Sequence, residues 1–253
     1  MPAPTLNPEG LPRLPDWPGA RVFCSTRAGG VSKAPCDSLN LGLHVGDDPS
    51  DVAVNRQRLA DAWGAKPVFL NQVHGTALIQ LDDHTPDHQE ADACWTQQPG
   101  VVCTIMVADC LPVLFYQPHA RVVAAAHAGW RGLSAGVLEN TLKTLSHVGA
   151  AHTWQVWLGP CIGPQAFEVG EEVRAAFAPQ GPLDGAFKAL PEPGKHLANL
   201  PLLARQRLRQ AGLQAVQGND GTPAWCTFTQ AHVYFSHRRD GRSGRFAAGI
   251  TLA

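Results

Sequence analysis

The run GVVCTIMVADCLPVLFY, residues 100–116, decides the fold, because only the short turn QPHA separates it from a second apolar run, ARVVAAAHAGWRG, residues 120–132. Neither run alternates regularly with polar residues, which is typical of strands that are buried on both faces. We therefore predict two neighbouring strands in a sheet that is covered on both sides. Asp109 and Cys110 interrupt the first run, and we expect them to lie within one strand that Pro112 helps to end.

Helix and strand patterns alternate on both sides of this centre. Residues 49–64 predict a helix that begins near Pro49 and ends at Gly64, and residues 133–145 predict another with Ser134 as its cap. Further helices are expected within residues 168–178 and 199–212, and further strands at 21–24 and within 66–75, 153–163 and 232–252. The chain is therefore expected to be of the mixed α/β (α+β) class, with a Pro-rich segment at 1–20 and a single domain at 21–253.

Composition points to a small molecule as the partner. The 253 residues are 44% hydrophobic and 16% charged, and the formal net charge is -1. Scattered Lys and Arg residues give no basic patch for nucleic acid, and no apolar run reaches the roughly 18 residues of a membrane span. The beginning of the chain lacks the basic and apolar parts of a signal peptide, and seven cysteines without a C-x-x-C pair indicate reduced thiols. We expect a cytoplasmic protein.

Three metal-binding residue types stand where an apolar run meets a polar, glycine-containing turn. They are His74 in FLNQVHG, Cys110 in MVADCLP and His127 in AAAHAGWRG. Two histidines and one thiolate suit Zn²⁺, although each residue taken alone is more typical of a buried thiol or a hydrogen-bonded histidine. The polar neighbours favour a site, and these neighbours are Asn71, Gln72, Asp109, Trp130 and Arg131.

Seven strings in one order extend the pattern over nearly the whole chain, from about Arg21 to the C-terminus. They are TRAGGVS, SLNLGLHVGDD, NQVHG, ADCLP, HAGWRG, GPCIG with FEVG, and FSHRRDGRSGR. Together they resemble the YfiH family, once labelled polyphenol oxidase laccase and now associated with purine nucleoside phosphorylase and adenosine deaminase activity. The resemblance implies a four-layer α-β-β-α sandwich and one zinc ion held by His74, Cys110 and His127. The chain departs from the usual family strings at Phe167, His237 and Ser243, which leaves the three metal ligands untouched.

The implied chemistry assigns roles to further residues. Three protein ligands leave an open position on zinc, where bound water can reach a pKa near 7 and attack C6 of adenosine. Asp109 is our candidate for proton transfer, although its place beside Cys110 equally suits a helix cap or a hydrogen bond to a metal ligand. For phosphorolysis, arginine can hold two phosphate oxygens, and we select Arg27 and Arg131 first. Substrate contacts are expected from Asn71, Gln72, Arg245 and His237.

Other functions use the same residues. A blue-copper site needs an axial methionine, but Met106 lies about 13 Å along a strand from Cys110, so copper is the less favoured metal. A cysteine hydrolase would use Cys110 as its nucleophile, and the family is also linked to peptidoglycan precursor editing, in which misincorporated serine is removed from nucleotide-linked muramic acid. A non-catalytic zinc protein would need a fourth ligand, for which His237 is the candidate.

Overall fold

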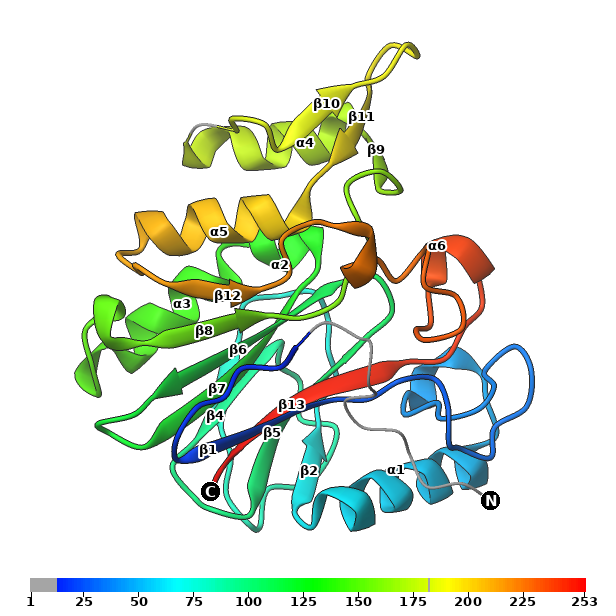
Figure 1. The fold of residues 1–253 in the computed structure, drawn as a ribbon, viewed down its shortest axis with the longest axis vertical. Coiled ribbons are helices and arrows are strands. Elements are labelled where there is room, and N and C mark those ends of the chain that lie inside the picture. The colour runs from blue at the N-terminus through cyan, green and yellow to red at the C-terminus, as the bar shows by residue number, and fades with distance from the viewer. Residues whose placement is uncertain (1–12, 182) are drawn as a thin grey trace.

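The computed structural model describes residues 13–181 and 183–253, which form one mixed α/β domain. Figure 1 shows two sheets stacked face to face, with helices on both outer faces. The α-helices are α1 (Pro49–Trp63), α2 (Trp130–Ala135), α3 (Val137–Thr144), α4 (Glu171–Phe177), α5 (Leu200–Gln210) and α6 (His237–Asp240). The strands are β1 (Ala20–Cys24), β2 (Lys66–Phe69), β3 (Leu78–Gln80), β4 (Ala93–Thr96), β5 (Val101–Val107), β6 (Leu111–Gln117), β7 (Val122–Ala128), β8 (Gln155–Leu158), β9 (Glu168–Gly170), β10 (Phe187–Ala189), β11 (Lys195–Ala198), β12 (Val216–Gly218) and β13 (Phe246–Leu252).

The two stacked sheets have different strand orders. The first is β1-β13-β5-β2, in which only the β2–β5 pair is parallel, and the second is β12-β8-β6-β7-β4-β3. Helix α1 packs on the outer face of the first sheet, whereas α3, α4 and α5 pack on the outer face of the second. The four-layer sandwich implied by the family resemblance is therefore confirmed. A third sheet, β10-β11-β9, lies with α4 at one end of the molecule (Figure 1).

The run 100–116 contains two strands rather than one. Strand β5 ends at Val107 in the first sheet, and β6 begins at Leu111 in the second, so the chain crosses between the sheets in three residues. Asp109 makes this crossing with a φ of 89°, a region that Asp tolerates better than most residues. The expectation of a single strand was wrong: both strands are buried on both faces, and the short interruption at Asp109 and Cys110 is the point where one strand ends and the next begins. Pro112 lies inside β6 and does not end a strand.

The prediction that the two apolar runs form neighbouring strands is confirmed for β6, the second strand of the first run, and β7, the strand of the second run. Strands β6 and β7 are antiparallel neighbours, with Pro112 opposite His127. Side chains along β7 point alternately into the core between the two sheets and into the core between the second sheet and its helices. Val123 and Ala125 lie between the sheets, so His127, two residues further on, points from the same face at the end of the strand.

The helix boundaries follow local chemistry. Asp48 caps α1 by accepting from the backbone N–H of Ser50, and Gly64, with a φ of 68°, ends the helix as predicted. Ser134 is not a cap, because it lies within α2 and its hydroxyl donates to the Arg131 carbonyl oxygen. The helix predicted near residue 134 is divided at Gly136, which has a φ of 96°.

Two sequence-based expectations concern the termini and the membrane. Residues 1–12 of the Pro-rich segment predicted at 1–20 lie outside the described residues, whereas Trp17 is buried against the layer between the sheets. Within residues 13–181 and 183–253, none of the helices combines the length and the apolar character needed to cross a bilayer.

Candidate metal centre

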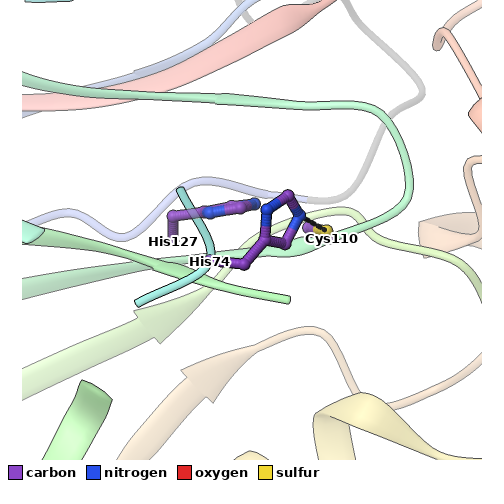
Figure 2. Close-up of side chains that lie close together, drawn as sticks. All are labelled: His74, Cys110 and His127. Atoms are coloured by element: carbon purple, nitrogen blue, oxygen red, sulfur yellow. Dashed lines mark hydrogen bonds between the residues drawn. The ribbon is translucent and has the colours of Figure 1, made fainter. Parts of the chain in front are cut away.

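His74, Cys110 and His127 converge at one end of the layer between the two sheets (Figure 2). His74 comes from the loop after β2, Cys110 from the crossing between β5 and β6, and His127 from the end of β7. One possible ligand atom of each residue lies within 4.8 Å of the other two, and Cys110 Sγ is 3.8 Å from His74 Nε2. The predicted triad is thus brought together from three distant parts of the sequence.

Asp92 holds two of these three residues in place. Its side chain is fully buried, and Oδ1 accepts from His127 Nδ1 at 2.8 Å and from the backbone N–H of His74 at 2.9 Å. Oδ2 accepts from the backbone N–H groups of Val73 and Gly75. Because the carboxylate requires a proton on Nδ1, the Nε2 atom of His127 is left to bind a metal. Asp92 was not among the residues selected from the sequence.

In the metal-free protein, Cys110 and His127 form a thiolate–imidazolium pair, and His127 must lose its Nε2 proton when a metal binds. Burial alone would raise the pKa of Cys110, but the charge of His127 and hydrogen bonds from both histidines lower it to about 6. Burial alone would lower the pKa of His127, but Cys110 and Asp92 raise it to about 9. Burial opposes ionisation of Asp92 too, and its bonds to His127 and the His74 loop nevertheless lower its pKa. Cys110 is therefore a thiolate near neutral pH, which is the form that binds metals.

Glycines make room for the triad. A Cβ atom on Gly129 would lie 2.8 Å from Cys110 Sγ and 2.9 Å from His74 Cδ2. A Cβ atom on Gly132 would lie 2.9 Å from the Gly75 carbonyl oxygen, so α2 could not pack as closely on the His74 loop. The glycines of HAGWRG are explained by these two close approaches.

Two cavities adjoin the triad and share a wall that includes His74, Cys110, Arg131 and His237. The first has a volume of about 190 Å³, and its other walls include the apolar side chains of Trp130, Ile162, Phe167 and Leu200. We call it the apolar cavity. The second has a volume of about 350 Å³ and adds His44, Gln72, His127 and Arg245. We call it the polar cavity.

The predicted substrate residues divide between these cavities and other places. Arg131 and His237 border both cavities, whereas Gln72 and Arg245 line the polar one. The Gln72 amide also bonds to both backbone groups of Met106, which ties the His74 loop to β5. Asn71 is exposed, pairs with Glu90 through a backbone β-bridge and lines neither cavity.

Arg27 lies in a separate place. It lines a cavity of about 370 Å³ with Asp37 and Ala231, and none of the triad residues borders this cavity. Its guanidinium bonds to the carbonyl oxygens of Asp37 and Ala231 and forms an ion pair with the Asp37 carboxylate at 3.3 Å. The structure therefore does not bring Arg27 to the same cavities as Arg131.

Asp109 lines the apolar cavity, but both of its carboxylate oxygens have partners. Oδ1 accepts from the Thr227 hydroxyl at 2.6 Å, and Oδ2 accepts from the backbone N–H of Arg238 in the first turn of α6 at 2.6 Å. Asp109 therefore joins the crossing to Thr227 and to the first turn of α6. The carboxylate thereby orients α6, which carries His237 and Arg238.

The residues fit a metal ion with three protein ligands. Two imidazole nitrogens and a thiolate form a donor set that suits zinc, and both adjoining cavities leave room for a further ligand. Within the described part of the chain, His237 does not belong to the group of close ligand atoms. Met106 packs on the α1 side of the sheet, with Sδ 4.0 Å from Arg56 Nη2, so its thioether points away from the triad.

Sequence analysis also missed several residues of the cavities. Trp130 was noted only as a neighbour of His127, and Phe167 only as a departure from the family string. His44 was not selected from the sequence, although it lines the polar cavity. The glycines beside it in SLNLGLHVGDD were the available signal, because glycine-rich polar loops commonly carry ligand contacts.

Known proteins resemble this chain over nearly its full length. A family model described as multi-copper polyphenol oxidoreductase laccase matches residues 21–253. A Pseudomonas aeruginosa protein named purine nucleoside phosphorylase is 49% identical over 94% of this chain and 97% of its own length. The Escherichia coli purine nucleoside phosphorylase YfiH is 47% identical over 94% and 98% of the two chains. The crystal structure of a Neisseria meningitidis protein, 41% identical, superposes with a TM-score of 0.87 over 94% and 97%. The chain therefore belongs to the YfiH family.

Proposed function

We propose that this protein is a zinc-dependent purine nucleoside phosphorylase that also deaminates adenosine. The observation that carries the proposal is a His-Cys-His group on the wall shared by an apolar and a polar cavity. An apolar cavity suits a purine base, and a polar cavity suits the ribose and phosphate. The names of the relatives from P. aeruginosa and E. coli support the same substrate class.

Zinc is the metal that we assign to His74, Cys110 and His127. When bound, it would supply Lewis-acid stabilisation of developing negative charge. Asp92 would keep His127 in the tautomer with Nε2 free and would hold the His74 loop at the correct distance. We place the reaction in the cytoplasm, where a thiol ligand remains reduced.

Phosphorolysis exchanges one bond at C1′ of the ribose. A phosphate oxygen forms a bond to C1′ as the bond from C1′ to the purine N9 breaks, and the proton that phosphate loses is balanced by the one that the purine gains. Arg131 suits the phosphate, because it borders both cavities and its guanidinium lies over the Trp130 ring at 4.3 Å. Its planar fork can hold phosphate oxygens beside the ribose carbon.

The remaining predicted residues have supporting roles in this proposal. We assign Asp109 to positioning α6, with proton transfer as a second hypothesis. Gln72 would hold the His74 loop, and His237 and Arg245 would contact substrate. Arg27 and Asn71 stay predictions without a defined place in the reaction, since neither borders a cavity at the triad.

Deamination of adenosine would use the same base cavity but a water molecule instead of phosphate. Water adds at C6 and ammonia leaves, so the products are inosine and ammonia. Three protein ligands favour this second activity, because they leave a coordination position that a water molecule can use.

The test is product analysis on protein of known metal content. Wild type and Cys110→Ala are supplied with inosine or adenosine, with and without phosphate. About one zinc per chain and phosphate-dependent release of free base, lost in the variant, would support the phosphorylase. Ammonia from adenosine without phosphate would support the deaminase. Zinc binding without any change in either nucleoside would refute both, and serine release from a nucleotide-linked muramic acid would then support the editing hydrolase.

A further inference from the structure

We propose that the polar cavity is the phosphate subsite and that Arg245 and His44, together with Arg131, hold the anion there. The purine then occupies the apolar cavity on the other side of Cys110. This inference rests on the proposed phosphorolysis and adds which residues hold the phosphate.

The polar cavity is lined by two arginines, Arg131 and Arg245, and by the imidazoles of His44 and His237. Burial and the charge of Arg245 lower the pKa of His44, so His44 can offer a neutral N–H donor to an anion. Among the described residues that line it, none is an Asp or a Glu. Positive groups that gather around one cavity without carboxylates favour an anionic ligand.

Arg245 lacks an anionic partner in the described part of the chain. Its Nη1 donates to the carbonyl oxygens of Ser243 and Gly244, both of which are neutral, and its side chain forms no ion pair there. Burial, which is the largest influence, lowers the pKa of Arg245. A guanidinium that is partly removed from water without a counter-charge is costly, and a bound phosphate would supply that charge.

The backbone around Arg245 keeps its side chain in the cavity. The Arg245 N–H donates to Asn40 Oδ1 at 2.9 Å, and the Leu41 N–H donates to the Arg245 carbonyl oxygen at 3.0 Å. A Cβ atom on Gly42 would lie 2.8 Å from Arg245 Cγ and 3.4 Å from His44 Cε1. The loop before His44 therefore packs directly against Arg245 and places both side chains on one cavity wall.

The apolar cavity also has two arginines on its wall, Arg131 and Arg238, but it differs from the polar cavity in its large apolar side chains. Trp130 and Phe167 offer two aromatic rings, and Ile162 and Leu200 complete an apolar lining. The one carboxylate on its wall, Asp109, is bonded through both oxygens to Thr227 and Arg238. Flat aromatic rings and aliphatic side chains favour a purine, which is stabilised by stacking and by burial of apolar surface.

The experiment measures the KM for phosphate and the KM for inosine separately, on zinc-loaded enzyme. Arg245→Lys keeps the charge but removes the planar fork, and we expect a phosphate KM at least tenfold higher with the inosine KM within about twofold. His44→Asn is expected to raise the phosphate KM in the same direction. Phe167→Leu should do the reverse, with a higher inosine KM and an unchanged phosphate KM.

Arg238→Lys is the matched control, because Arg238 borders only the apolar cavity and its guanidinium lies 5.3 Å from the Phe167 ring. A rise in phosphate KM in Arg238→Lys but not in Arg245→Lys would overturn the assignment of the cavities and leave the phosphorylase intact. Thermal unfolding of each variant checks that the domain is folded. If Arg245→Lys does not fold, His44→Asn takes its place as the test variant.

A binding measurement separates the two proposals. Equilibrium dialysis measures the binding of inorganic phosphate to zinc-loaded wild type and to zinc-loaded Arg245→Lys, with hypoxanthine present. Binding that weakens at least tenfold in the variant supports the anion subsite even if the wild type turns over no nucleoside, in which case only the phosphorylase fails. Equal binding to both proteins, or no binding to the wild type, overturns the subsite.

Discussion

At the scale of single residues, Asp92 shows how one carboxylate can determine a metal centre that it does not enter. Each of its oxygens accepts two hydrogen bonds, and the four donors come from His127 and from the loop that carries His74. Only an ionised carboxylate offers four acceptor positions, and aspartate is the shorter of the two side chains that carry one. The distance between two ligands from different elements therefore depends on a single side chain.

Replacing Asp92 with Asn should weaken metal binding more than it weakens the fold. In either amide orientation, an NH₂ group would face two N–H donors, so the His74 loop or the His127 ring must move. We expect zinc affinity to fall about ten- to a hundredfold, measured by competition with a chelator. Asp87→Asn is the control, because Asp87 bonds to Arg56 and to the Phe69 N–H instead. Equal affinities in the two variants would contradict the role of Asp92.

Cys110 should be the reactive thiol of the metal-free protein. Its pKa is lowered to about 6, whereas burial raises the pKa of Cys24 to about 12 and also raises that of Cys161. The thiolate fraction of Cys110 therefore rises with pH through about 6 and is nearly complete at pH 8. We expect iodoacetamide to label Cys110 first, with a rate that follows this curve, as measured by peptide mass spectrometry. Zinc should suppress labelling; labelling at the same rate with zinc bound would favour a free nucleophile.

At the scale of elements, the backbone between β7 and α2 passes close to two residues of the triad, Cys110 and His74. Gly129 has a φ of -65°, which any residue can adopt, so alanine there causes no backbone strain. Its methyl group would nevertheless lie within 3 Å of Cys110 Sγ and His74 Cδ2.

We therefore expect Gly129→Ala to lower zinc affinity at least tenfold while the melting temperature of the metal-free protein changes little. Chelator competition and thermal unfolding measure the two quantities. A large loss of metal-free stability with unchanged zinc affinity would show that Gly129 serves packing instead of the metal centre.

The elements also show where sequence patterns are informative. The caps of α1 are readable from Asp48, Pro49 and Gly64, because these residue types have local conformational preferences. The crossing at Ala108–Cys110 was misread, because both strands that flank it are buried on two faces and the polar break at Asp109 was taken to lie within a single strand. The positive φ of Asp109 is the local feature that marks it.

At the scale of the whole molecule, the triad was predictable and its surroundings were only partly so. His74, Cys110 and His127 are distinctive residue types beside apolar runs, and the resemblance to the YfiH family, more than their spacing, singled them out as ligands. Whether Arg27 or Arg131 lies beside them depends on which strands pair and how the sheets stack, and sequence alone does not give that geometry. The role of Asp92 could not be predicted for the same reason, since its hydrogen-bond partners are distant along the chain.

Zinc should stabilise the whole domain, because its ligands join both sheets. Free zinc at a hundred times its Kd contributes about 2.7 kcal/mol to the folded state. For a chain of this size we expect the melting temperature to rise by roughly 5–10 °C. Calorimetry of wild type and Cys110→Ala with added zinc measures the effect, and Mg²⁺ serves as the control ion. An equal rise in both proteins would place the stabilising ion elsewhere.

The crossing between β5 and β6 also bears on the order of folding. His74 follows a strand of the first sheet, His127 ends a strand of the second, and Cys110 lies on the short segment that joins them. Loop closure alone does not align these three residues, so the metal centre is complete only when the sheets have packed. Metal capture therefore marks a late event in the maturation of the chain, and a newly made copy that holds its ion has already formed its central core.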